Sequence, residues 1–381
     1  MNIAVLRETQ PGESRVALVP ESVKKLVALK AAVTVESGAG LSAGASDDDY
    51  RSAGAEVSED RDAVLSAADV LASINRPAGS DVRRMKRGAA LIGFLRPLDE
   101  PRELTAAAEA GVTAFAMELV PRITRAQAMD ALSSMATVAG YKAAVIAAAE
   151  LPRMFPLLMT AAGTVPPARV LVLGAGVAGL QAIATARRLG AVVEAYDVRA
   201  AAGEQVRSLG ATFLEVDLGG IETEDKGGYA KELTPEALER GRQLIATRAR
   251  ASDVVITTAQ VPGRPAPLLV TEEAVAGMRP GAIIIDLAGP SGGNCALSRP
   301  GEEWVARGVR IMCPLNLPAT IPVHASQLYS RNVTAFLSPL IKDGQLVIDM
   351  ADDVVGPSCV THNGEFVNQR VAAALGAGAG S

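Results

Sequence analysis

Three glycines at a strand-to-helix junction are the residues whose spacing most directly indicates chemistry. Gly174, Gly176 and Gly179 follow four apolar residues at 170–173 and open a segment with helical spacing. In this context the first glycine permits a tight turn, the second lets the backbone approach a pyrophosphate, and the third lets the helix pack against the strand. The sequence therefore predicts a dinucleotide-binding turn, with the N–H groups of the helix N-terminus facing the phosphates. A glycine-rich turn without a ligand is the alternative.

An acidic residue stands where such a site would meet a ribose. Asp197 ends the next apolar run, Val192–Tyr196. A carboxylate at this point accepts hydrogen bonds from a ribose 2′-OH and repels a 2′-phosphate, so we expect NAD(H) to be preferred over NADP(H). The backbone near Ala259 and Gln260, and near 287–289, follows later strands and is expected to face the same cofactor.

A polar segment at 121–133 has two interpretations. Thr124 and Gln127 have the spacing of a capping box, in which Gln127 would only reach back to the start of a helix. Alternatively, Arg122, Gln127, Asp130 and Ser133 line a cleft between two domains and hold the nicotinamide end of the cofactor. Spacing alone favours the capping box.

A charged insertion at 219–231 interrupts the regular alternation of strands and helices. Long loops in compact domains are commonly lids over a site or inert surface excursions, and the residues alone favour neither. Tyr229 is the residue that could fold over a bound nucleotide.

The chain is poor in groups that move protons. Its two histidines are His324 and His362, and Ser73, Asn75 and Arg96 fall at strand ends of the first domain, where no lysine stands. Oxidation of an amino acid needs a general base, whereas hydride transfer between two nicotinamides needs positioning and exclusion of water. The composition favours the second reaction.

Composition excludes several other functions. The net charge is −5 with no basic tract, which argues against nucleic acid as a partner. Three widely spaced cysteines suit reduced thiols, and two isolated histidines argue against a metal site. No signal peptide is visible, and the apolar window 138–163 is interrupted by charges and prolines, so we expect no direct membrane span.

Apolar strands alternate with helical patterns along most of the 381 residues, which predicts two α/β domains. Residues 134–324 are expected to form a Rossmann-type doubly wound parallel sheet that binds NAD(H). Residues 1–133 with 325–381 are expected to form a second Rossmann-like or flavodoxin-like domain, with 372–381 as a flexible tail. The segment 121–159 is expected to be mostly helical, with 164–167 as a linker. Expected strands lie at 3–6, 33–36, 70–74, 90–95, 112–117, 170–173, 192–196, 212–216, 253–258, 282–286 and 309–313.

Nearly the whole chain, from 15–20 to 359–362, resembles the NAD(H)-binding alpha subunits of proton-translocating NAD(P) transhydrogenases, in the bacterial form whose membrane parts are separate chains. The wider family includes alanine dehydrogenase and saccharopine dehydrogenase. The motifs that carry the resemblance are spread over both domains, at 7–9, 122–133, 174–179, 196–199, 227–232 and 316–318.

The resemblance implies roles for individual residues. It implies that Gln127 and Asp130, with Arg122 and Ser133, contact the nicotinamide and its ribose, and that Gln127 bridges to NADP(H) on a partner. It also implies that Tyr229 closes over NAD(H), and these five residues form the expected catalytic set. The expected NAD(H)-binding set is Gln127, Ala128, Met129, Asp130, Gly174, Gly176, Val177, Gly179, Asp197, Val198, Arg199, Gly228, Ala259 and Gln260.

The resemblance also bears on substrates and partners. Where alanine dehydrogenases carry a substrate-binding lysine and a catalytic histidine, this chain has Ser73 and Arg96, which speaks against alanine oxidation. A soluble alanine-type dehydrogenase and a non-catalytic NADH-binding module are the alternatives. The expected partners are a second copy of the chain and NADP(H)-binding and membrane-spanning subunits, so we expect the protein at the cytoplasmic face of the inner membrane.

Overall fold

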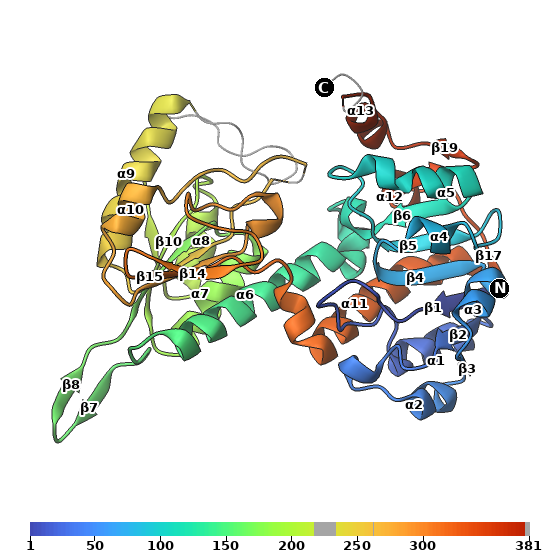
Figure 1. The fold of residues 1–381 in the computed structure, drawn as a ribbon, viewed down its shortest axis with the longest axis horizontal. Coiled ribbons are helices and arrows are strands. Elements are labelled where there is room, and N and C mark those ends of the chain that lie inside the picture. The colour runs from blue at the N-terminus through green and yellow to red at the C-terminus, as the bar shows by residue number, and fades with distance from the viewer. Residues whose placement is uncertain (217–233, 262, 378–381) are drawn as a thin grey trace. The chain divides into compact units, whose positions relative to one another are not determined.

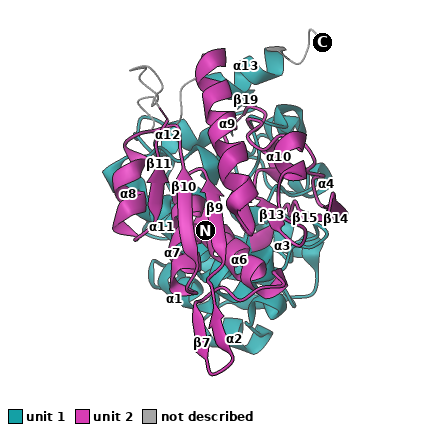
Figure 2. Ribbon diagram, turned by 90° about the vertical axis from the view of Figure 1, so that its left-hand side faces the viewer, with its two compact units in different colours: residues 1–135, 318–381 teal, residues 136–317 magenta. Residues whose placement is uncertain are grey.

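The chain divides into two compact units, which Figure 2 shows in two colours. The computed structural model describes residues 1–216, 234–261 and 263–377. Unit 1 contains Met1–Met135 and Pro318–Ser381, and unit 2 contains Ala136–Leu317. The returning segment begins at Pro318, earlier than the expected residue 325, because the turn η6 (Leu317–Thr320) leads directly into helix α11 (Pro322–Leu337) of unit 1.

The sheet of unit 1 has eight strands in the order β19-β18-β6-β5-β4-β1-β2-β3. Six strands are parallel, and this part follows the order of a doubly wound Rossmann sheet. The five expected strands of this region are confirmed, whereas β3, β18 and β19 are found only in the structure. The strands are β1 (Asn2–Val5), β2 (Ala32–Glu36), β3 (Glu56–Ser58), β4 (Val70–Asn75), β5 (Ala90–Phe94), β6 (Thr113–Ala116), β18 (Cys359–His362) and β19 (Glu365–Phe366).

Helices cover both faces of this sheet (Figure 1). One face packs on α3 (Arg61–Ala67), α4 (Gly79–Val82), α5 (Thr105–Ala110) and α13 (Gln369–Ala377). The opposite helices are α1 (Pro20–Ala28), α2 (Asp47–Ser52) and α11. Two aromatic pairs join α11 to the strands: ring centroids lie 5.2 Å apart for Phe94 and Tyr329, and 5.4 Å apart for Phe115 and Phe336. The C-terminal segment is therefore part of this core.

The sheet of unit 2 has seven strands in the order β11-β10-β9-β12-β13-β15-β14. The six expected parallel strands are confirmed, and β14 adds an antiparallel edge strand. The strands are β9 (Arg169–Leu173), β10 (Val192–Tyr196), β11 (Thr212–Leu214), β12 (Val254–Thr257), β13 (Ile283–Asp286), β14 (Glu303–Ala306) and β15 (Val309–Met312).

Strand residues of unit 2 alternate between two cores. Val170 and Val172 pack with residues of α6 (Ala131–Glu150) and α7 (Val177–Arg188), whereas Leu171 and Leu173 pack with residues of α9 (Pro235–Ala251) and α10 (Glu272–Ala276). Both faces of the sheet are thus buried, which explains why its strands read as continuous apolar runs. Helix α8 (Ala202–Ser208) completes the described helices of this unit.

The segment after α6 departs from the expectation. Residues 151–159 are not helical and 164–167 are not a simple linker, because β7 (Leu158–Thr160) and β8 (Gly163–Val165) form an antiparallel hairpin. Pro152 and Pro156 prevent α6 from continuing. The hairpin is exposed and projects from the rest of unit 2 (Figure 1).

Helix α6 bears on the expectation that the chain has no direct membrane span. Among the described residues it is the one helix long and apolar enough to cross a membrane by length and composition, and 39% of its most apolar stretch is buried. Ala143, Ala144 and Ala147 lie in the core of unit 2. Core helices of globular proteins share this length and composition, so α6 by itself does not indicate a membrane span.

The expected flexible tail is partly helical. Residues 372–377 continue α13, whose Val371 is completely buried against unit 1, and 378–381 lie outside the described residues. The remaining short elements are η1 (Leu41–Ala43), η2 (Pro101–Leu104), η3 (Met117–Leu119), η4 (Thr124–Met129), η5 (Gly289–Ser291), η7 (Ser338–Leu340), β16 (Ile341–Lys342), β17 (Gln345–Leu346) and α12 (Val355–Ser358).

Candidate functional site

The glycine turn joins β9 to α7 and leaves open space in front of the helix. Gly174 has a positive φ of 95°, and a Cβ there would lie 2.6 Å from Thr258 Oγ1. A Cβ on Gly179 would lie 1.8 Å from the Gly174 carbonyl oxygen, so only glycine lets α7 pack this closely. A Cβ on Gly176 would meet no atom within 4 Å. The backbone at the start of α7, including Val177, can therefore be approached closely, as a pyrophosphate requires.

Another glycine supports this turn and was not predicted from the sequence. Gly140 lies in α6, and a Cβ there would come within 2.0 Å of the Ala178 carbonyl oxygen in the first turn of α7. The only signal in the sequence is a single glycine in an alanine-rich helical segment, which marks close packing. Gly140 thus sets the distance between α6 and the phosphate end of α7.

Asp197 follows β10 and is bound to the glycine turn. Its Oδ2 accepts a 2.7 Å hydrogen bond from the Ala175 N–H, and its side chain is 7% exposed. The Arg199 backbone N–H and Nε donate to Oδ1 at 2.8 and 2.9 Å, and Nη2 donates to Oδ2 at 2.8 Å. The structure thus places Asp197 beside the turn, as a ribose-binding acid requires, and adds an arginine contact that the sequence did not indicate. Val198 lies between them in the chain.

The loop after β12 is fixed by a buried amide. Asn294 Oδ1 accepts from the Ala259 N–H at 3.0 Å, and its Nδ2 donates to the Ala259 carbonyl at 2.9 Å. Gln260 donates to the Leu287 carbonyl at 2.8 Å. Asp286, which is completely buried, accepts hydrogen bonds from the Asn294 and Cys295 N–H groups at 2.7 and 3.0 Å. Asn294 and Asp286 were missed from the sequence, although an aspartate ending an apolar strand was a signal.

The capping-box interpretation of Thr124 and Gln127 is wrong. Thr124 is the first residue of the 3₁₀ helix η4, which has no side-chain cap. The cap belongs to Asp130: its Oδ1 accepts from the Ser133 N–H at 2.8 Å, and its Oδ2 accepts from Ser133 Oγ at 2.6 Å. Asp130 precedes α6 directly and therefore caps that helix. Within the described residues, the exposed Gln127 side chain has no hydrogen-bond partner.

Contacts within unit 1 hold η4 in place. Asn332 of α11 donates from Nδ2 to the Ala128 carbonyl at 2.9 Å, and Met129 is buried. Arg125 forms ion pairs with Asp352 and Asp353. The exposed Arg122 precedes η4.

The expected site residues therefore fall into two groups. The six expected residues of 122–133 lie in unit 1, whereas those from Gly174 to Gln260 that the structure describes lie in unit 2. Gly228 and Tyr229 lie outside the described residues.

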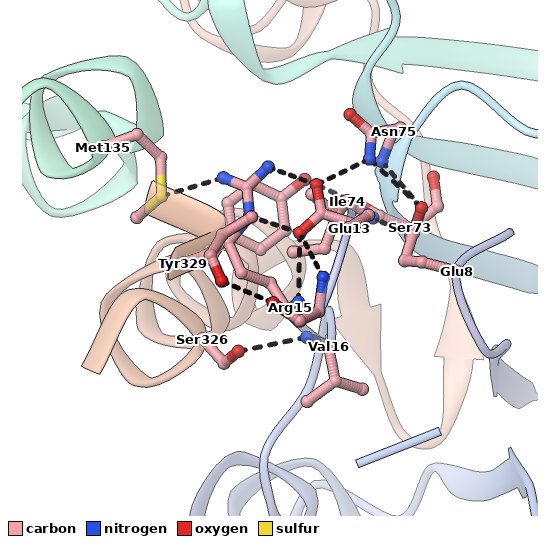
Figure 3. Close-up of polar contacts among 12 residues, drawn as sticks. Glu8, Glu13, Arg15, Val16, Ser73, Ile74, Asn75, Met135, Ser326 and Tyr329 are labelled. Atoms are coloured by element: carbon pink, nitrogen blue, oxygen red, sulfur yellow. Dashed lines mark hydrogen bonds and ion pairs between the residues drawn. The ribbon is translucent and has the colours of Figure 1, made fainter. Parts of the chain in front are cut away.

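Unit 1 carries a different cluster at the carboxyl ends of β1 and β4, shown in Figure 3. Arg15 and Glu13 form a buried ion pair, with Arg15 Nη2 2.5 Å from Glu13 Oε2 and side chains that are 5% and 1% exposed. Asn75 Nδ2 donates to Glu13 Oε2 at 2.9 Å and to Glu8 Oε2 at 3.3 Å. Arg15 Nη1 also contacts Met135 Sδ at 3.2 Å. This cluster was not predicted as a unit.

The pKa values of the two carboxylates in the cluster shift in opposite directions. Burial raises the pKa of Glu8 to about 7, although the Ile74 N–H hydrogen bond at 2.6 Å opposes this. Burial also acts on Glu13, but the hydrogen bonds and charge of Arg15 outweigh it and lower the pKa to about 2. Burial likewise raises the pKa of Glu118, after β6, to about 7, and its Oε2 is buried without a partner among the described residues.

The edge of unit 2 is suited to a dinucleotide. Open backbone at Gly176, the N-terminus of α7 and a carboxylate beside the turn match a pyrophosphate with its adjacent ribose. Among the described residues there is no cluster of three or more His, Cys, Asp or Glu side chains that could hold a metal ion.

Comparison with known proteins identifies the chain's relatives. Residues 4–139 match the family model of the alanine dehydrogenase/PNT N-terminal domain, and 143–369 match that of the C-terminal domain. An NAD(P) transhydrogenase alpha subunit of Rhodospirillum rubrum is 49% identical, over 97% of this chain and 98% of that protein. An alanine dehydrogenase of Mycobacterium tuberculosis is 30% identical, over 99% and 97%. A transhydrogenase structure from Sinorhizobium meliloti matches with a TM-score of 0.87 and 45% identity, covering 96% of this chain and all of that one.

Proposed function

The chain belongs to the alanine dehydrogenase/PNT family, and from this premise we propose that it is the NAD(H)-binding alpha subunit of a transhydrogenase. It would bind NADH and pass a hydride directly to NADP⁺ held on a partner subunit. The similarity to transhydrogenase subunits at 49% identity, against 30% for an alanine dehydrogenase, supports this choice.

The observation that carries the proposal is the turn between β9 and α7. Open backbone at Gly176 is adjacent to helix N–H groups that can bind a pyrophosphate, and Asp197 is held beside it by the Ala175 N–H. Asp197 would bind the adenosine ribose and exclude a 2′-phosphate. The loop at Ala259–Gln260, fixed by Asn294, would border the cofactor.

In this proposal the 122–133 segment binds the nicotinamide end. The Asp130–Ser133 cap fixes the start of α6, while the exposed Gln127 side chain is available to contact the nicotinamide and a partner's cofactor. NADH supplies the hydride when it is bound. The protein's role is to hold the donor carbon close to the acceptor and exclude water, which needs no acid or base at the reacting carbons.

The proposed partners are a second copy of the chain and NADP(H)-binding and membrane-spanning subunits. The Rhodospirillum rubrum relative is named as a subunit of a transhydrogenase, which supports the existence of partner subunits. The exposed hairpin β7–β8 supports a homodimer, because Leu158, Met159 and Val165 are exposed and an isolated hairpin is barely stable in water. Peripheral attachment at the cytoplasmic face of the inner membrane would follow from the membrane partners.

The test is hydride transfer from NADH to an NADP⁺ analogue in a mixture of this chain with an NADP(H)-binding transhydrogenase subunit. We expect transfer that requires both proteins. A chain that binds NADH and gives no transfer would instead be a non-catalytic NADH-binding module.

The second candidate is an alanine-type dehydrogenase, which the 30% identical relative favours. Ser73 and Arg96 stand where the resemblance places the substrate-binding lysine and the catalytic histidine of alanine dehydrogenases, which weighs against this candidate. Incubation of the purified chain with NAD⁺ and alanine decides between the two candidates, because sustained NADH production would replace the proposal.

A further inference from the structure

Every acceptor position of the Asp197 carboxylate is filled from within the chain. Oδ1 accepts from the Arg199 backbone N–H and Nε, and Oδ2 accepts from the Ala175 N–H and Arg199 Nη2. A carboxylate offers about four lone-pair positions, two on each oxygen. The four donors therefore saturate it.

Two of these donors can leave and two cannot. The Ala175 and Arg199 N–H groups belong to the backbone of the turn and of the 197–199 segment, so they stay with the fold. The Arg199 guanidinium is on a flexible side chain that is 20% exposed. It contacts both oxygens as a fork, the geometry in which arginine binds carboxylates most tightly.

A ribose competes for the positions that the guanidinium holds. Its hydroxyl groups would donate to the same carboxylate oxygens, and a hydroxyl donor is neutral whereas the guanidinium is charged. Both kinds of bond are charge-assisted, because the acceptor is an ionised carboxylate, but only the guanidinium adds its own charge and a two-point fork. The four acceptor positions are already filled. Binding of the ribose at Asp197 therefore requires the guanidinium to move away.

We infer that Arg199 is a latch on the adenosine-ribose position, whose guanidinium must leave Asp197 before NADH can bind there. This inference rests on the proposed NAD(H) site and assigns Arg199 a specific role in it. The latch lowers the affinity for NADH and slows its association, because the binding-competent arrangement is only fractionally populated. Arg199 is thus a positioning residue that acts through Asp197.

A supporting role for Arg199 would change the NADH affinity in the opposite direction when the guanidinium is removed. If Arg199 held Asp197 in its binding position or contacted the ribose itself, removing the guanidinium would weaken NADH binding. If it is a latch, removal tightens binding. The sign of the change separates the two roles.

The experiment compares Arg199→Met with the natural chain in NADH titrations followed by calorimetry and stopped-flow fluorescence. Methionine keeps an apolar stem and the backbone N–H bond to Oδ1, and removes only the guanidinium. We expect the Kd for NADH to fall about tenfold, mainly through faster association, a change equivalent to about 1.4 kcal/mol. Arg199→Lys should lie between the two, because an ammonium cannot reproduce the fork.

Two further variants control the interpretation. Arg207→Met removes an exposed arginine that pairs with Glu215 in the same unit, and should leave the Kd unchanged. Asp197→Asn removes the negative charge and replaces one acceptor oxygen by an NH2 donor, and should weaken NADH binding. An unchanged or higher Kd in Arg199→Met would overturn the latch. Failure of the natural chain to bind NADH would instead overturn the proposed function.

Discussion

The six parallel strands of each unit follow the same order, and the units differ in the connection that leaves the first of these strands. In unit 2 that connection is three residues long, 174–176, and two of them are glycines. It leaves the backbone accessible in front of α7. In unit 1 the corresponding connection runs over residues 6–19 and places Glu8, Glu13 and Arg15 at the same edge of its sheet. One edge is open backbone, and the other is filled by buried charged side chains.

This difference shows that topology alone does not make a binding site. Both sheets have a switch point at which ligands bind in doubly wound folds. Among the described residues, unit 2 alone combines open backbone at this point with the N-terminus of a long helix. Unit 1 uses its switch point to hold the 6–19 segment, since Val16 and Val19 also donate to Ser326 and Ser330 of α11 at 3.0 Å each.

The largest expected effect comes from breaking the buried pair of unit 1. Arg15→Ala leaves Glu13 buried without its partner, which typically costs roughly 3–5 kcal/mol. We expect that loss in the free energy of unfolding, measured by urea denaturation, with no loss of NADH affinity in the folded protein. The double variant Arg15→Met with Glu13→Gln should recover much of the stability. A loss below about 1 kcal/mol in Arg15→Ala would show that the pair does not hold this edge together.

The buried carboxylate Glu8 should make the stability of unit 1 depend on pH, unlike the open backbone of unit 2. The pKa of Glu8 is about 7 in the folded chain against an ordinary value of 4.5, so the folded state holds this proton more tightly than the unfolded state. The natural chain should therefore lose stability relative to Glu8→Gln as pH rises from about 4.5 to about 7. The loss should reach up to about 3.5 kcal/mol, at about 1.4 kcal/mol per pKa unit. Thermal unfolding at several pH values measures this difference. The exposed Glu59, changed to Gln, controls for loss of a surface charge, and a difference that does not vary with pH would contradict the prediction.

At the edge of unit 2, a single methyl group should damage binding and spare the fold. Gly176→Ala adds a Cβ that meets no protein atom, at the position where a pyrophosphate would approach. We expect the Kd for NADH to rise at least about tenfold, or about 1.4 kcal/mol, while the unfolding free energy changes by less. Gly376→Ala in α13, which also meets no atom, is the matched control. Equal Kd values for the two variants would place the pyrophosphate elsewhere.

The smallest effects are expected for variants in the 122–133 segment of unit 1. Asp130→Ala removes the cap of α6 and should cost about 1 kcal/mol of stability. Gln127→Asn should leave the melting temperature nearly unchanged, because the side chain is exposed and without a partner among the described residues. It should also leave the Kd for NADH nearly unchanged, because Asn keeps the amide group and the other proposed contacts remain. It should nevertheless slow hydride transfer to the NADP(H)-binding subunit. If Gln127→Asn lost stability and rate in parallel, Gln127 would have a structural role.

The sequence predicted the features that depend on local pattern. Apolar runs placed the parallel strands except β3, and the glycine spacing at 174–179 placed the turn correctly because each glycine meets a steric requirement within a few residues. The saturation of Asp197 by Arg199 and the clamp of Asn294 on Ala259 depend on side-chain rotamers and on residues far apart in the chain, which spacing does not encode. The capping box failed because Thr124–Gln127 and Asp130–Ser133 both have capping spacing, and only the second pair precedes a true α-helix.

Titration of the purified natural chain with NADH and with NADPH, followed by calorimetry, tests the central claim most directly. Open backbone at Gly176 and the acid at Asp197 predict saturable NADH binding and NADPH binding at least about a hundredfold weaker, a difference of about 2.8 kcal/mol. Equal affinities for the two cofactors, or tighter binding of NADPH, would contradict the account.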